Sequence, residues 1–89
     1  MGKLVAVFRV MPEDADVDLE TIKAGVKASV PKDAELQGWQ VVPVAFGLKA
    51  LEVTVVMEDE SGAGPDGVEL AFSEIAGVGS VQMTDVGRI

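Results

Sequence analysis

The sequence predicts an α+β domain in which a four-stranded antiparallel sheet is covered on one face by two helices. Segments with the period-2 alternation of apolar and polar residues that is typical of strands are interleaved with segments whose apolar residues recur every three or four positions, as in helices. The order is strand, helix, strand, strand, helix, strand. The 89 residues are enough for one compact domain, spanning residues 1–89.

The first part of the chain predicts one strand and one helix. Residues 3–10 have a period-2 pattern rich in β-branched residues, with Leu4, Ala6, Phe8 and Val10 on one face, and Pro12 ends this strand. A helix is expected next, because its apolar residues have three- and four-residue spacing: Leu19, Ile22, Val26 and Val30. Asp16 or Asp18 can cap the first amides of this helix, and Pro31 ends it.

The second part predicts two adjacent strands, a helix and a last strand. Strands are expected at residues 34–42, which include Trp39, and 50–58, with Pro43 and Gly47 bracketing a short turn. Residues 61–67 are expected to form a glycine-rich loop, with Pro65 suited to a first helical turn. The second helix has the apolar stripe Val68, Ala71, Phe72 and Ile75. The last strand is expected to end near Val86.

This order is the βαββαβ arrangement of ferredoxin-like domains. Right-handed crossovers with both helices on one face predict the spatial strand order 4-1-3-2. In that topology the turn at residues 44–46 and the end of the last strand lie at opposite ends of the sheet. Phe46 and Arg88 are therefore expected to be about 20 Å apart, which is six residues at about 3.3 Å each.

The composition excludes several classes of function. The chain contains no Cys, His or Tyr, so thiolate nucleophiles, disulfides, imidazole metal sites and His-based catalytic triads are excluded. A formal charge of −8 disfavours direct binding of nucleic acid or of an anionic membrane. No apolar run is long enough to span a membrane, and we expect a cytoplasmic protein that needs no cofactor and no metal.

Two motifs resemble ligand sites and are interpreted otherwise. Residues 62–67 match G-x-G-x-x-G, but the acidic run at residues 58–60 would repel a pyrophosphate and Pro65 lacks an amide donor. Asp14, Asp16 and Asp18 have the spacing of a calcium loop, but Leu19 stands where that loop needs Gly. We interpret the first motif as a loop that leads into a helix and the second as a capped helix start.

Two side chains near the ends of the sheet have alternative interpretations. Phe46 lies at the tip of a short hairpin, where it can either fold back over the sheet edge or enter a pocket on a partner. Arg88 follows the expected last strand by two residues, and by default it is a frayed surface group. Residue chemistry alone does not choose between the two alternatives for Phe46.

The sequence resembles the guanine nucleotide exchange domain of translation elongation factor 1-beta, especially its archaeal form. The resemblance rests on VPVAFGLKAL at residues 42–51, VVMEDE at residues 55–60 and VGRI at residues 86–89, and it extends over the chain. It implies a factor that promotes the replacement of GDP by GTP on elongation factor 1-alpha, GDP-bound or nucleotide-free, during peptide-chain elongation. The factor would make no covalent bond of its own and would be monomeric when free.

The resemblance also implies which residues bind the GTPase. Phe46, flanked by Ala45 and Gly47, would anchor in a hydrophobic site, and Arg88, followed by Ile89, would reach toward the magnesium and phosphate region. Eukaryotic relatives have Lys in place of Arg88 and Gly in place of Ala45, and a planar guanidinium differs from a compact ammonium. The alternative function is a ferredoxin-like module that binds a small ligand or serves as a subunit of a complex, without exchange activity.

Overall fold

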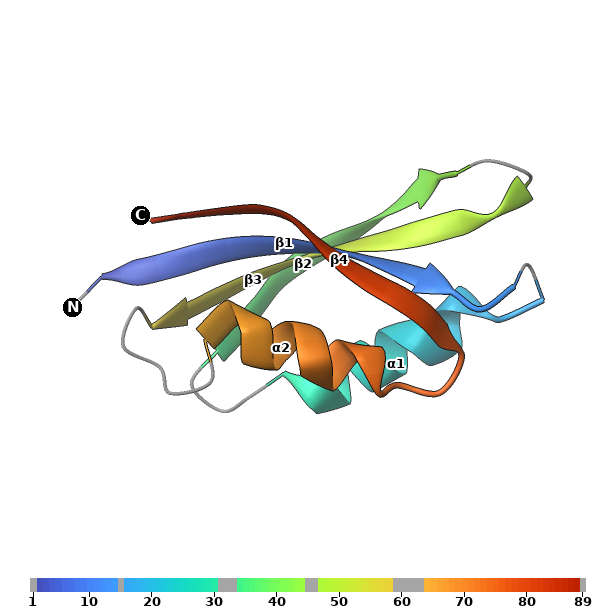
Figure 1. Ribbon diagram of the computed structural model, residues 1–89, viewed down its shortest axis with the longest axis horizontal. Coiled ribbons are helices and arrows are strands. Elements are labelled where there is room, and N and C mark those ends of the chain that lie inside the picture. Colours follow the sequence, from blue (N-terminus) through green and yellow to red (C-terminus); the bar gives the residue numbers. More distant parts are fainter. Residues whose placement is uncertain (1, 15, 31–33, 45–46, 59–63, 89) are drawn as a thin grey trace.

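A computed structural model describes residues 2–14, 16–30, 34–44, 47–58 and 64–88. The elements are β1 (Lys3–Pro12), α1 (Leu19–Ser29), β2 (Ala34–Pro43), β3 (Lys49–Glu58), α2 (Gly64–Ser73) and β4 (Val78–Arg88). The strands form one antiparallel sheet in the order β2-β3-β1-β4, and both helices lie under the same face of it (Figure 1). The predicted ferredoxin-like fold and strand order are therefore confirmed.

The two central strands explain why the sheet has one covered face. On β1 the fully buried residues are Ala6, Phe8 and Val10, which alternate with half-buried ones. They pair with Val55, Val53 and Leu51 of β3, which are also fully buried. Because side chains of paired residues point to the same face, these six form one apolar surface against the helices.

Helix α1 begins where the sequence places a cap. The carboxylate of Asp18 accepts a hydrogen bond from the amide of Glu20 at 2.9 Å, and the backbone of Asp18 has the extended conformation of an N-cap residue. The Asp14 carboxylate accepts from the amide of Asp16 at 2.9 Å in the preceding turn. The interpretation of the spaced aspartates as a capped helix start is confirmed, and the cap is Asp18.

The loop predicted before helix α2 is too long. The backbone of α2 is already helical at Gly64, so the expected loop over residues 61–67 is wrong for its second half. Pro65 falls in the first helical turn, as its fixed φ and missing donor favour. The stripe then places Val68 and Phe72 in the core, while Ile75 packs against the core from just beyond the helix.

The core lies between the sheet and the helices, where Ile22 and Val26 of α1 meet Val68 and Phe72 of α2. Burial of these side chains is the main term that stabilises a domain of this size. In the part of the chain that the structure describes, neither helix is long and apolar enough to cross a membrane.

Candidate functional site

The hairpin between β2 and β3 is closed close to its tip. The amide of Val44 donates a hydrogen bond to the carbonyl of Leu48 at 2.8 Å, next to the pair Pro43 and Lys49. Three residues remain between the bonded positions. Gly47, the last of them, has φ +77°, the left-handed conformation that ends many three-residue hairpin loops. A Cβ at Gly47 would meet nothing within 4 Å, so the backbone and not the space requires glycine.

The candidate anchor itself falls in this loop. Ala45 and Phe46 lie outside the described residues, so whether Phe46 is exposed stays a prediction. The residues on either side place the loop: Val44 and Leu48 extend the ladder of β2 and β3 beyond Pro43 and Lys49. The loop therefore continues from the end of the sheet at which these two strands meet (Figure 1).

A hollow that was not predicted from the sequence lies beside the hairpin. Its volume is about 260 Å³, and it is lined by Pro12, Asp14, Val17, Leu19, Gly47 and Lys49. The hollow joins the base of the hairpin to the segment that leads into α1. The hollow was missed because these residues are brought together only by the pairing of β1 with β3.

The other candidate residue, Arg88, is part of the sheet. β4 extends from Val78 to Arg88, and the Cα partner of Arg88 is Leu4 on β1. The expectation that this strand ends near Val86 is wrong, and so is the interpretation of Arg88 as a frayed group, because pairing with β1 continues to the last described residue. The Arg88 residue is exposed. Ile89 lies outside the described residues.

The register places Arg88 and the hairpin at opposite ends of the sheet. Arg88 is paired with Leu4, and Leu4 is paired with Met57 of β3. Along β3, Met57 is eight residues from Lys49 at the hairpin, which corresponds to about 26 Å at about 3.3 Å per residue. Figure 1 shows the same arrangement, with the C-terminus and the hairpin at opposite ends of a molecule whose longest extent is 42 Å.

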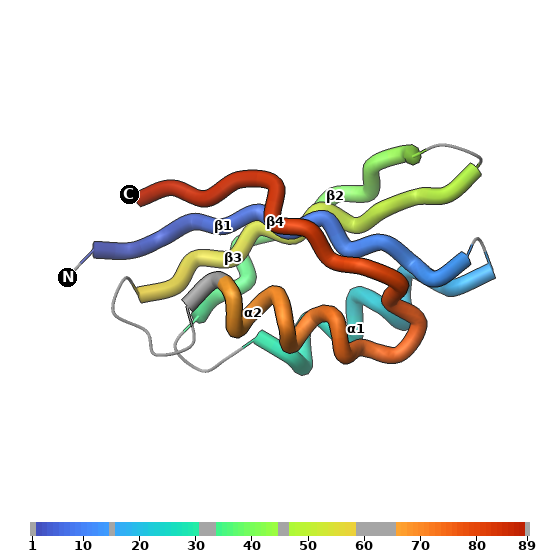
Figure 2. Tube along the Cα trace, viewed as in Figure 1, coloured from blue at the N-terminus to red at the C-terminus, as the bar shows by residue number. Residues whose placement is uncertain are grey.

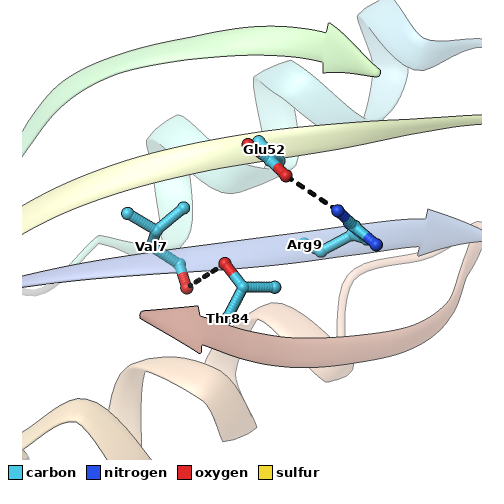
Figure 3. Close-up of polar contacts among 4 residues, drawn as sticks. All are labelled: Val7, Arg9, Glu52 and Thr84. Atoms are coloured by element: carbon cyan, nitrogen blue, oxygen red, sulfur yellow. Dashed lines mark hydrogen bonds and ion pairs between the residues drawn. The ribbon is translucent and has the colours of Figure 1, made fainter. Parts of the chain in front are cut away.

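The open face of the sheet lies between these ends. At its centre the Arg9 guanidinium forms an ion pair with the Glu52 carboxylate at 3.0 Å, and the Thr84 hydroxyl donates to the carbonyl of Val7 at 3.3 Å (Figure 3). A hollow of about 360 Å³ is lined by Val7, Gln37, Gly38, Trp39, Gln40, Glu52 and Thr54. On the central strands this face offers the aliphatic side chains of Val5, Val7 and Val56, the hydroxyl of Thr54 and the paired charges of Arg9 and Glu52.

Comparison with known proteins gives a consistent result over the chain. Residues 5–89 match the family described as the EF-1 guanine nucleotide exchange domain. The chain is 46% identical to elongation factor 1-beta of Methanosarcina barkeri and 44% identical to that of Halobacterium salinarum, in both cases over all of both chains. It is 43% identical to elongation factor 1-beta of Methanobrevibacter smithii, over all of this chain and 99% of that one.

A solved structure shows the same fold in a different context. The chain resembles the C-terminal domain of the MgtC protein from Mycobacterium tuberculosis with a TM-score of 0.61, over 96% of this chain and 87% of that one. At 18% identity this similarity concerns the fold alone.

Proposed function

Because the chain belongs to the family of EF-1 guanine nucleotide exchange domains, we propose that the two ends of its sheet contact two separate parts of the GTPase elongation factor 1-alpha. The chain is a guanine nucleotide exchange factor that promotes the replacement of GDP by GTP in peptide-chain elongation. The hairpin end, with Ala45, Phe46 and Gly47, holds one part of the GTPase. The other end presents Arg88 and Ile89 to the nucleotide site.

The observation that carries this proposal is the distance between the ends. A four-stranded sheet with two helices on one face is stiff along its strands, so the hairpin end at Lys49 and the end at Arg88, separated by about 26 Å along β3, have a fixed relation to one another. The tight hairpin supports an anchoring role for Phe46, since a three-residue loop has little length with which to return to the core. Pairing up to Arg88 supports a defined face of the sheet from which its side chain leaves the backbone.

Exchange then follows from linkage. A factor that binds the nucleotide-free GTPase more tightly than the GDP-bound form must weaken GDP binding by the same coupling free energy. A thousandfold faster release of GDP requires about 4 kcal/mol of barrier lowering. Burial of one aromatic anchor, at about 1.5–3 kcal/mol, and displacement of charges around the bound phosphates together reach this magnitude. The factor makes and breaks no covalent bond, and it acts in the cytoplasm as a monomer.

Stopped-flow release of a fluorescent GDP analogue from elongation factor 1-alpha tests the two roles separately. We expect Phe46→Ala to raise the factor concentration that gives half-maximal release, because affinity is lost. We expect Arg88→Ala to lower the release rate at saturating factor. Leu70→Ala is the control, since Leu70 is exposed on the outer side of α2, away from both ends. An unchanged rate at saturating Arg88→Ala would refute the role given to Arg88.

A further inference from the structure

Each edge strand of the sheet has a bulge in its middle part, and these two bulges lie at the same level; β4 has a further register shift at its start, opposite Met11 and Pro12. On β4 the pairing passes from Phe8 with Met83 to Val7 with Asp85, which leaves Thr84 as an extra residue. On β2 a similar shift lies between Leu36 and Gly38, beside Thr54 of β3. Since Val7 and Thr54 are themselves Cα partners, the bulges face each other across the two central strands. Figure 2 shows the step that the trace of β4 makes there.

The bulge at Thr84 decides which face of the sheet each later residue of β4 occupies. Side chains of a regular strand alternate, so one extra residue moves all the following ones to the other face. With the bulge, Val86 lies opposite the buried Ala6, and Arg88 lies opposite Leu4, whose side chain packs against the core. Arg88 therefore belongs to the face of the sheet that the helices cover.

A regular β4 would be unfavourable at two positions. Continued alternation from the pair Phe8 and Met83 would place Asp85 opposite Ala6, on the apolar side of the sheet. It would also place Arg88 opposite Lys3, and like charges directly across a ladder repel each other. The bulge avoids both, and the Thr84 hydroxyl satisfies the Val7 carbonyl beside it (Figure 3).

We propose that the bulge at Thr84 is a positioning element for nucleotide exchange, because it selects the face of the sheet from which Arg88 reaches the GTPase. This inference rests on the proposed role of Arg88. Thr84 itself touches neither nucleotide nor metal. The bulge acts only through the register of the last four residues of β4.

The direct test exchanges the residues at positions 87 and 88. The double variant Gly87→Arg with Arg88→Gly keeps composition and length but moves the guanidinium to the open face, opposite Val5. The site tolerates a side chain, because a Cβ at Gly87 would meet nothing within 4 Å. We expect the GDP release rate at saturating factor to fall at least tenfold, to the level of Arg88→Ala. The control exchanges Ser80 and Gln82, two exposed residues of β4 that lie on the open face.

Two single deletions of equal length test the register itself. Deleting Gly87 moves Arg88 to the position opposite Val5, so the maximal rate should fall like that of the exchanged variant. Deleting Thr84 removes the extra residue and leaves Arg88 opposite Leu4, so the rate should stay within threefold of the parent. If the two deletions behave alike, or if the exchanged variant keeps the parent rate, the inference is wrong.

Failure of the inference is distinguishable from failure of the proposed function. Loss of rate in Arg88→Ala together with full activity of the exchanged variant overturns only the choice of face. Full activity of Arg88→Ala overturns the role of Arg88 and the inference with it. Circular dichroism and urea unfolding show whether each variant is folded. If a deletion variant does not fold, the GDP release rate of the exchanged variant alone decides whether the inference is right.

Discussion

The rings of Phe8 and Phe72 meet edge to face, with their centroids 5.5 Å apart and their planes at 84°. Phe8 lies on β1 in the middle of the sheet and Phe72 lies on α2, and neither is exposed to solvent. This contact joins α2 to a central strand that pairs with both β3 and β4. The position of α2 against the centre of the sheet therefore depends on this contact.

Replacing Phe72 with Ala should lower the free energy of unfolding by about 3–5 kcal/mol, through lost burial and the cavity left behind. That is a large part of the 5–15 kcal/mol or so that stabilises a typical domain. Urea unfolding followed by circular dichroism measures it. Leu70→Ala in the same helix is the control, with an expected change within about 0.5 kcal/mol because Leu70 is 64% exposed. Equal effects of the two variants would contradict the packing described here.

Replacing Asp18 with Ala should cost about 0.5–2 kcal/mol, because the amide of Glu20 loses its capping carboxylate. Asp18→Ser should recover most of that loss, since a hydroxyl oxygen can cap the same amide. Asp16→Ala is the matched control, because Asp16 takes part in this turn through its backbone amide, which donates to the Asp14 carboxylate, and not through its side chain. A loss in the Asp16 variant as large as in the Asp18 variant would mean that charge, and not capping, is the cause.

Replacing Gly47 with Ala should cost about 1–2 kcal/mol, because a residue with a Cβ is strained at φ +77°. Gly47→Asn should cost less, since Asn adopts the left-handed region more readily. The same order should appear in the factor concentration needed for half-maximal GDP release, if the loop must hold Phe46 in place. If both variants bind the GTPase like the parent, the shape of the loop does not matter for anchoring.

The fold could be predicted from the sequence wherever one periodicity holds through an element. Alternation around Phe8 and the stripe around Ile22 each determine one buried face, and topology then determines the strand order. The loop before α2 was predicted to extend to Gly67 because glycine disfavours helices, although Pro65 was expected in the first helical turn. Burial of the stripe that begins at Val68 outweighs that local preference.

The two bulges could not be predicted by alternation, because each is a break in it. A signal was nevertheless present: apolar residues that should recur every two positions are three apart between Leu36 and Trp39, and again between Met83 and Val86. Trp39 and Val86 reach the helix side of the sheet only because an extra residue precedes each of them. At the candidate site, strict alternation would have assigned Arg88 to the wrong face.

The ion pair on the open face can show whether the GTPase contacts only the two ends of the sheet or also its middle. The Arg9 and Glu52 side chains that pair there are 38% and 24% exposed, so solvent screens their attraction. The Nε of Arg9 is buried and has no hydrogen-bond partner among the described residues, which offsets part of the gain. The pair should therefore contribute little to stability.

A double-mutant cycle with Arg9→Met and Glu52→Gln should give a coupling free energy of about 0.2–1 kcal/mol in urea unfolding. Methionine keeps the apolar stem of Arg9 in place, so the cycle reports the charge interaction and not lost packing. GDP release from elongation factor 1-alpha should be unchanged in the single variants and in the double one, because this pair lies in the middle of the open face, away from both ends of the sheet. A release rate lowered by Arg9→Met, with stability retained, would instead place the middle of the open face against the GTPase and make the contact continuous.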